Sequence, residues 1–193
     1  MRNIVLPAAI AATLFTTGCG GCAESATETI LAKAVGASDV DVDAKSGTVT
    51  IKGKDGEVVH MVAEGDDAAT LTIKGKDGEY HMNTGGAGKV PEDFPLAVHA
   101  GSKVQGSASS SNDEERTFML SLVSEAAVDE IAAFYKKELE ARGLKVERTD
   151  VATDGRKFVT LGGRSEKREA SVAISSGDEG DGTFTQISVR DRK

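Results

Sequence analysis

Apolar and polar residues alternate from residue 39 onward, which is the pattern of half-buried β-strands. In the Asp-Val-Asp-Val-Asp run of residues 39–43, three carboxylates would lie on one face and two valines on the other. Residues 48–57 return almost unchanged as residues 70–79, and each copy is an alternating stretch followed by a Lys-Asp-Gly turn. The two hairpins predict a four-stranded antiparallel meander, to which residues 39–43 add an edge strand.

A short amphipathic helix is predicted before the meander. A Ser-x-x-Glu capping pattern begins at Ser25, and apolar residues then recur at helical spacing until Gly36. Since the meander would leave one apolar face uncovered, we expect this helix, at residues 26–35, to pack on it. That face is expected to consist of Val49, Ile51, Leu71, Ile73, Tyr80 and Met82.

A longer amphipathic helix is predicted at residues 125–142, in which Val128, Ile131, Ala132, Tyr135 and Leu139 recur at helical spacing. Ser124 can cap its start, and Gly143 suits the left-handed residue that ends a helix. Alternating patterns around it predict the strands of a second sheet, at residues 118–123, 144–150, 156–161, 170–175 and 183–189. The serine-rich residues 107–111 are expected to form a loop after a short strand at residues 103–104. The expected core anchors are Phe118, Phe134, Phe158 and Phe184.

A boundary between two units is predicted in the middle of the chain. Residues 84–89 are rich in glycine, and two of the three prolines follow, Pro91 and Pro95. The predicted fold class is therefore α+β. A small antiparallel β-meander with one short helix (residues 25–84) is followed by a Gly/Pro linker (85–98) and by a second unit with one long helix on an antiparallel sheet (99–193).

The first residues have the features of an export signal. A short positive region precedes an apolar stretch at residues 4–15, which is shorter than the roughly 20 residues that a spanning helix needs. Residues 14–19 resemble the lipobox of bacterial lipoproteins. The resemblance implies a signal peptide at residues 1–18, a lipid on Cys19 and a tether at residues 19–24. Gly20 after the lipidated residue implies the outer membrane, facing the periplasm; ordinary cleavage near Ala23 is the alternative.

Three further features of the sequence resemble those of a known group of proteins. They are the two Thr-Ile-Lys-Gly-Lys-Asp-Gly-Glu hairpins, residues 91–95 with residues 101–104, and residues 134–139. Together they resemble a group of uncharacterised bacterial lipoproteins. The resemblance implies location and architecture, and it carries no activity and no catalytic residue to this chain.

The composition argues against several functions. Aromatic residues make up 4% of the chain and Trp is absent, so stacking surfaces for sugars or bases are scarce. The formal net charge of -8 also disfavours nucleic acid as a partner. With three histidines, no Gly-x-Ser-x-Gly elbow and both cysteines, Cys19 and Cys22, at the tether, no catalytic residue and no cofactor is assigned. We therefore expect the chain not to be an enzyme.

Basic residues gather near the C-terminus, at Arg164, Lys167, Arg168, Arg190, Arg192 and Lys193. They could face anionic lipid or cell-wall polymer, but a solvated strand edge that discourages aggregation is the favoured interpretation. The predicted function is that of a non-catalytic lipoprotein of the cell envelope. It would be held to the membrane by its lipid anchor and would bind an envelope protein or polymer.

The alternative function is copper binding. His60-Met61 and His81-Met82 each lie on the returning strand of a hairpin, and imidazole and thioether are both ligands that suit copper. Adjacent residues of a strand point to opposite faces, however. Each pair is therefore expected to place Met in the core and His in water.

Overall fold

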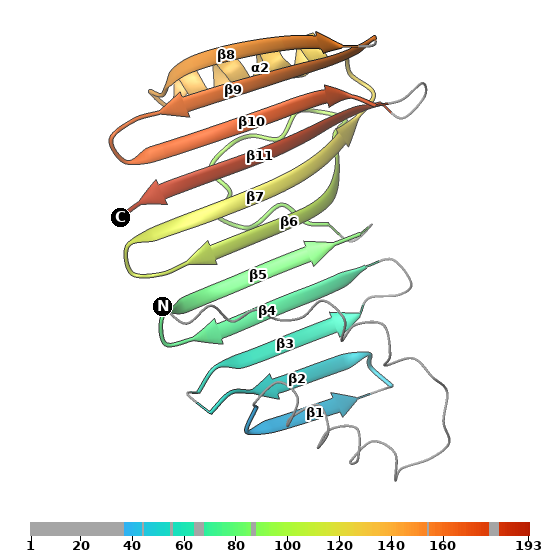
Figure 1. Cartoon of the computed structure of the whole chain (residues 1–193), viewed down its shortest axis with the longest axis vertical. Helices are drawn as coiled ribbons and strands as arrows, with labels where there is room; N and C mark the ends of the chain where they lie inside the picture. Colours follow the sequence, from blue (N-terminus) through green and yellow to red (C-terminus); the bar gives the residue numbers. More distant parts are fainter. Residues whose placement is uncertain are drawn as a thin grey trace.

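The computed structural model describes residues 37–43, 45–54, 56–63, 68–85, 88–153, 155–177 and 182–193. They form one antiparallel sheet of eleven strands in the order β1-β2-β3-β4-β5-β6-β7-β11-β10-β9-β8 (Figure 1). The export signal, Cys19, Cys22 and the helix predicted at residues 26–35 lie outside the described residues. The strands are β1 (Asp39–Asp43), β2 (Thr48–Lys52), β3 (Val58–Ala63), β4 (Ala69–Gly75), β5 (Gly78–Thr84), β6 (Lys103–Ser111), β7 (Glu115–Ser124), β8 (Lys145–Thr153), β9 (Arg156–Arg164), β10 (Arg168–Ser176) and β11 (Thr183–Arg192).

The predicted fold class is wrong, because the strands of the two expected units belong to one sheet. β5 pairs directly with β6, from Glu79↔Ser111 to Thr84↔Gly106. The serine-rich residues 107–111 are therefore part of a strand and not a loop. Their side chains offer no apolar alternation, but a strand between two others is held by backbone hydrogen bonds to both neighbours. The proposed domain boundaries stay a prediction.

One helix, α2 (Val128–Ala141), lies against β8, β9 and β10. Its buried face consists of Val128, Ile131, Ala132, Tyr135 and Leu139, as the helical spacing predicted. Gly143 ends it with a φ of 74°, and Leu144 N–H donates to the Leu139 carbonyl at 3.1 Å. Ser124 does not cap it: the N-cap is Ala127, which makes no side-chain cap bond. Among the described residues, no helix combines the length and the apolar character that crossing a membrane requires.

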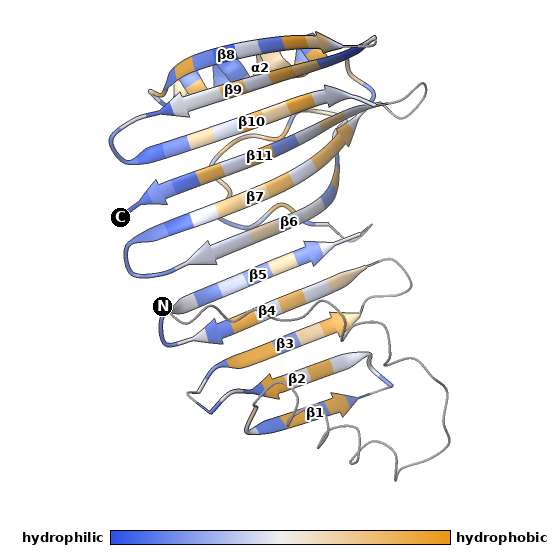
Figure 2. Ribbon diagram, in the orientation of Figure 1, coloured by the Kyte–Doolittle hydropathy of each residue, from blue (hydrophilic) through white to orange (hydrophobic). Residues whose placement is uncertain are grey.

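The apolar side of the sheet changes from one face to the other along the strand order. We call the face that carries α2 the helix side and the opposite face the far side. Across β7, β11, β10 and β9, a row of fully buried side chains points to the helix side; it comprises Leu120, Ile187, Val172 and Leu161. Across β2 to β5 the apolar row instead lies on the far side; it comprises Val49, Met61, Leu71 and Met82. Figure 2 shows apolar residues alternating with polar ones in both halves.

The expected linker packs against the helix side. The rings of Phe94 and Phe118 meet edge to face, with centroids 6.1 Å apart. Leu96 is buried in the same core as α2, and Arg142 Nε donates to the Pro95 carbonyl at 2.5 Å. Residues 94–96 are therefore fixed by contacts with both layers of the protein.

Two adjacent glycines of β9 test the assignment of faces. Gly163 points to the helix side, where an added Cβ would lie 3.1 Å from Leu144 Cδ2. Gly162 points to the far side, where a Cβ would meet no described atom within 4 Å. We expect Gly163→Ala to lower the free energy of unfolding by roughly 1–3 kcal/mol through overpacking, and Gly162→Ala to leave it nearly unchanged. Urea unfolding of both variants measures the difference, and equal effects would contradict the assignment.

Candidate functional site

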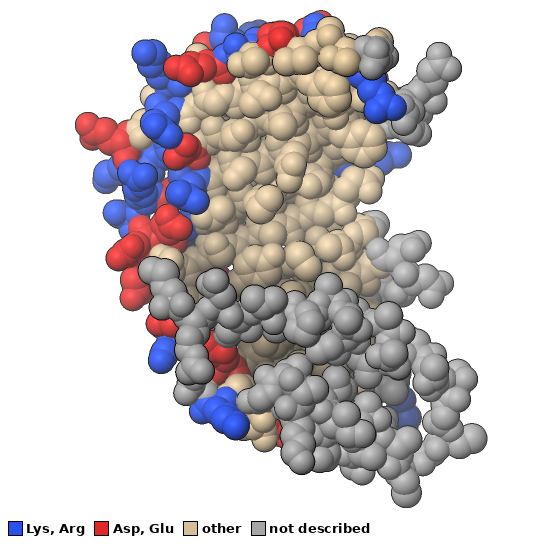
Figure 3. Space-filling view, in the orientation of Figure 1, with Lys and Arg blue, Asp and Glu red and all other residues tan. Residues whose placement is uncertain are grey.

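The far side of β7, β11, β10 and β9 presents a broad surface without charge. Twelve outward residues form three rows across these strands, and we call this surface the uncharged face. The first row is Val123, Phe184, Ser175 and Phe158, the second is Ser121, Gln186, Ala173 and Thr160, and the third is Met119, Ser188, Ser171 and Gly162. Figure 3 shows this surface with its Lys, Arg, Asp and Glu side chains along the margins.

Phe158 and Phe184 are not core anchors, which corrects the expectation from their apolar character. Phe158 is 43% exposed and Phe184 is 47% exposed. Phe118 is buried as expected, and Phe134 is partly buried against the core. Alternate residues of a strand point to opposite faces of the sheet. Val159 and Leu161 of β9 are buried on the helix side, so Phe158, which precedes Val159, points to the far side. Two large aromatic rings are therefore left in contact with solvent on one surface.

A shallow hollow of about 530 Å³ lies within the uncharged face. Phe158 and Phe184 line it, and Ser175 lies between them because it pairs with both, Phe184 on β11 and Phe158 on β9. Gln105 reaches its rim from a β-bulge in β6, where the pairing with β7 shifts between Val104 and Gly106. The hollow thus offers aromatic surface, hydroxyl groups and two amides, and no residue that lines it carries a charge.

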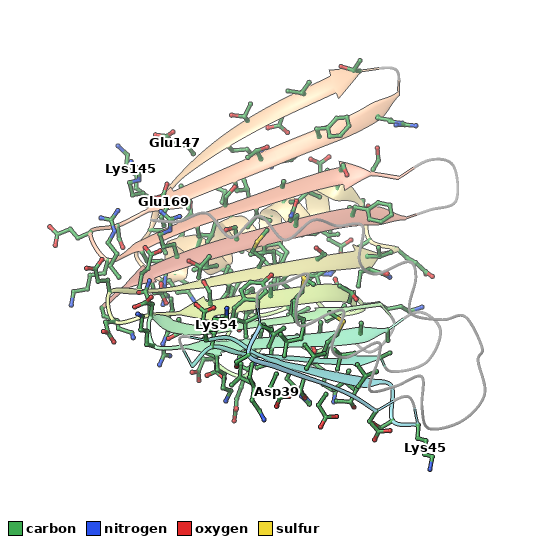
Figure 4. All side chains as sticks on the ribbon, turned by 60° about the horizontal axis from the view of Figure 1, so that its bottom comes forward. Asp39, Lys45, Lys54, Lys145, Glu147 and Glu169 are labelled. Carbon is green, nitrogen blue, oxygen red and sulfur yellow. The ribbon has the colours of Figure 1, made fainter. Side chains whose placement is uncertain are left out.

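Charged residues border the uncharged face at one end of the strands. Arg164 and Glu169 form an ion pair at 2.7 Å, and the hydrogen bond from Arg164 holds the pKa of the Glu169 carboxyl below its usual value. Figure 4 shows Glu169 grouped with Lys145 and Glu147 at this end. Three residues of the predicted basic cluster, Arg164, Arg168 and Arg190, are paired with acids, and they lie on inner strands of the sheet and not on an edge strand.

A carboxylate of α2 ties the helix to the edge of the sheet. Asp129 accepts hydrogen bonds from Lys157 Nζ at 2.7 Å and from Arg148 Nη2 at 3.0 Å. These two donors, Lys157 first, hold the pKa of Asp129 below its usual value. This cluster therefore ties the start of α2 to β9 and to β8, the last strand of the sheet.

The His-Met pairs do not place their ligands together. His60 and His81 point to the helix side, where each is hydrogen-bonded at 3.1 Å to a threonine of a neighbouring strand. Met61 and Met82 point to the far side, in the apolar row of β2 to β5. No group of three or more His, Cys, Asp or Glu residues suited to a metal ion occurs among the described residues. The sheet therefore separates the imidazole from the thioether in both pairs.

A second hollow, of about 510 Å³, lies on the helix side between β5, β6 and residues 89–93. Several of its charged side chains form ion pairs within the chain: Glu79 with Lys74 at 2.7 Å and Arg116 with Asp93 at 3.0 Å. The hydrogen bond from Lys74 also lowers the pKa of Glu79. These contacts hold residues 89–93 against the sheet, so the hollow is part of the packing of that segment.

The most buried ionisable group of α2 is Tyr135. Its hydroxyl accepts a hydrogen bond from the His99 backbone N–H at 3.4 Å, and burial raises the pKa of Tyr135 to about 12. The phenol therefore keeps its proton at neutral pH. The Tyr135 hydroxyl therefore has a structural role: it accepts a hydrogen bond from a backbone N–H beneath the helix.

Comparison with known proteins adds one finding. A family model described as START domain-like matches residues 104–182, a region that contains β6 to β10 and α2 but less than half of the chain. The match agrees with the coarser part of the predicted function, namely a domain that binds a ligand. No curated protein and no solved structure matches the chain. Most of the uncharged face lies within the matched region.

The uncharged face was not predicted from the sequence, although a signal for it is present. In β7, β9, β10 and β11 the residues that alternate with the buried ones are mostly Ser, Thr, Ala, Gln, Met and Phe. Solvent-facing strand positions often carry charge, as the exposed aspartates of β1 do. The four strands with mostly uncharged outward residues are neighbours in the sheet, so these residues form one surface. That surface can be recognised only when the strand order is known.

Proposed function

We propose that this chain is a binding module of the cell envelope, held there by a lipid on Cys19, whose uncharged face contacts its partner. The observation that carries the proposal is the pair of exposed rings, Phe158 and Phe184, in a hollow whose lining has no charged group. Exposed apolar surface costs free energy in water, and contiguous patches of it on soluble proteins usually mark interaction sites. The match to a START domain-like model, which covers β7, β9 and β10 but not β11, supports a binding role.

The chemistry of the hollow favours binding over catalysis. Its side chains offer dispersion contacts through Phe158 and Phe184 and hydrogen bonds through Ser175, Thr160 and Gln186. General acid–base work needs a group that titrates near the working pH, whereas these side chains keep one protonation state. The supported activity is the recognition of an uncharged partner surface.

The anchor gives this recognition a location. A lipid on Cys19 would keep the module at a membrane, because each buried methylene adds about 0.8 kcal/mol of membrane affinity. Membrane fractionation of the wild type and of Cys19→Ala tests this part of the proposal. We expect Cys19→Ala to move from the membrane pellet to the soluble fraction, and an unchanged distribution would exclude the anchor.

Crosslinking from inside the hollow tests the surface. We would replace Ser175 with a photo-crosslinking amino acid in the native cell, and as a control replace Ala133, which is exposed on the outer side of α2. We expect a discrete adduct from position 175 and none from position 133. If position 175 gives no adduct, or if both positions give the same adducts, the uncharged face is not the binding surface.

A further inference from the structure

We propose that the uncharged face binds a neutral, linear polysaccharide that lies across the strands, with sugar rings against Phe158 and Phe184. This inference rests on the proposed function and names the chemical class of the partner. The face of an aromatic ring is negative and the C–H groups of a sugar ring are weakly positive, so the two stack favourably. Phe158 and Phe184 offer such faces to solvent on one surface.

The spacing of the two rings suits a chain of sugars. Phe184, Ser175 and Phe158 occupy one row across β11, β10 and β9. Their strands are two sheet spacings apart, roughly 9.6 Å, which is about the length of two sugar units in an extended chain. A polymer that runs along this row would place alternate rings on the two phenylalanines and pass over the Ser175 hydroxyl between them.

Polar groups run parallel to this row. Ser121, Gln186 and Thr160 lie in the adjacent row of the same face, each within the lining of the hollow. Hydroxyl and amide groups both donate and accept hydrogen bonds, as sugar hydroxyls do. A ligand along the phenylalanine row would therefore have partners for the hydroxyls on one of its edges.

The absence of charge from the hollow selects against an ionised ligand. A charged group placed on this surface would lose part of its hydration and find no ion of opposite sign among the residues that line the hollow. Charged side chains of the same face, such as Lys103 beside Val123 and Arg156 two residues before Phe158, lie outside the lining of the hollow. Charge complementarity therefore favours a neutral polymer over an anionic one.

A second copy of the chain fits this surface less well. Four strands and three rows span an area on the order of 19 by 20 Å, or about 400 Å². A stable protein interface buries about 800 Å² on each partner. A slender ligand that crosses the strands matches the available area better than another folded domain does.

This inference revises the exclusion of carbohydrate made from composition. That argument counted aromatic residues over the whole chain, where they make up 4%. The structure instead places two of the six phenylalanines together, exposed and in one row. Local arrangement and not overall abundance determines whether a stacking site exists.

Sedimentation with insoluble polymers tests the inference. The probes are chitin and cellulose, with immobilised polygalacturonate as the anionic comparison, and the protein is the chain from residue 19 with Cys19→Ala. We expect retention on at least one neutral glycan and little on polygalacturonate. Phe158→Ala combined with Phe184→Ala should lower retention at least tenfold. Val90→Ala, at an exposed apolar residue outside the hollow, is the matched control and should not change it.

Phe158→Trp provides a second readout, because the chain has no Trp and the new indole would be the only one. It should retain binding and change its fluorescence when soluble oligosaccharides of the retained glycan are added. The inference is overturned if no neutral glycan retains the protein, if polygalacturonate retains it equally, or if the double alanine variant binds as well as the Val90→Ala control.

The adduct from position 175 separates this inference from the proposed function. If glycoside hydrolases collapse the adduct and proteases leave its polymer part intact, both stand. If the adduct resists glycoside hydrolases and proteases degrade the partner, the uncharged face binds a protein and the polysaccharide inference is wrong. If no adduct forms, both fail.

Discussion

Leu161→Ala is expected to lower the free energy of unfolding by about 3 kcal/mol, because it removes a large apolar side chain from a filled core. Leu161 has no exposed surface and lies under α2 in the row of fully buried residues. Phe158, three positions earlier on the same strand, is 43% exposed on the far side. We expect Phe158→Ala to cost about 1 kcal/mol or less, although its ring is larger.

Urea unfolding followed by circular dichroism measures both changes. Leu161→Ala should shift the midpoint strongly, while the slope stays the same for both variants. Thr160→Ala serves as a further control, because Thr160 is an exposed neighbour on the far side. If Phe158→Ala proved the more damaging change, β9 would present its other face to α2, and the uncharged face would not exist as described.

The two copies of the hairpin repeat provide the second large effect. Gly56 and Gly78 occupy the same place in the repeated Lys-Asp-Gly-Glu sequence, and both have a positive φ, of 83° and 139°. A Cβ at Gly78 would lie 2.2 Å from the Ser111 carbonyl oxygen, whereas one at Gly56 would meet no described atom within 4 Å. Gly56→Ala should cost roughly 1–2 kcal/mol from backbone strain alone. Gly78→Ala should cost at least about 3 kcal/mol, because strain and a backbone clash add.

Thermal unfolding of the two variants side by side tests this difference. The reason for it lies in the sheet: Gly78 begins β5, which pairs with β6 near Ser111, while Gly56 lies in the turn between β2 and β3. Equal losses in both variants would mean that β6 does not continue the sheet from β5. The comparison therefore also tests whether the two halves of the protein form one sheet.

Local patterns predicted many elements with accurate limits. The strand at residues 39–43 has the limits expected from its Asp-Val alternation, and the core face of α2 comprises the residues that helical spacing selected. The hairpin repeats form β2 to β5 as predicted. These features depend on side chains a few residues apart, so the sequence contains the information directly.

Elements without a pattern of their own were missed. Residues 107–111 are five residues of Ser and Ala that carry no alternation, yet they form part of β6 because β5 and β7 pair with them on both sides. Residues 94–96 also have no strand or helix pattern, yet Phe94 and Leu96 pack against the core beside α2. In both cases the deciding contacts come from residues distant in the sequence.

The candidate site depends on tertiary structure for the same reason. The apolar character of Phe158 and Phe184 predicted burial, and only the parity of their strands relative to α2 places them on the far side. The two exposed phenylalanines lie in one row because β11, β10 and β9 are neighbours in the sheet. The sequence does not specify that order.

The sequence by itself determined the alternation of each strand, the amphipathic helix, the repeated hairpins and the negative net charge. Tertiary structure alone decided that the strands form one sheet, that its apolar side changes face, and which uncharged residues gather into a surface. The physical reason is that the period of a strand fixes which residues share a face, whereas only packing against the helix decides which face is buried.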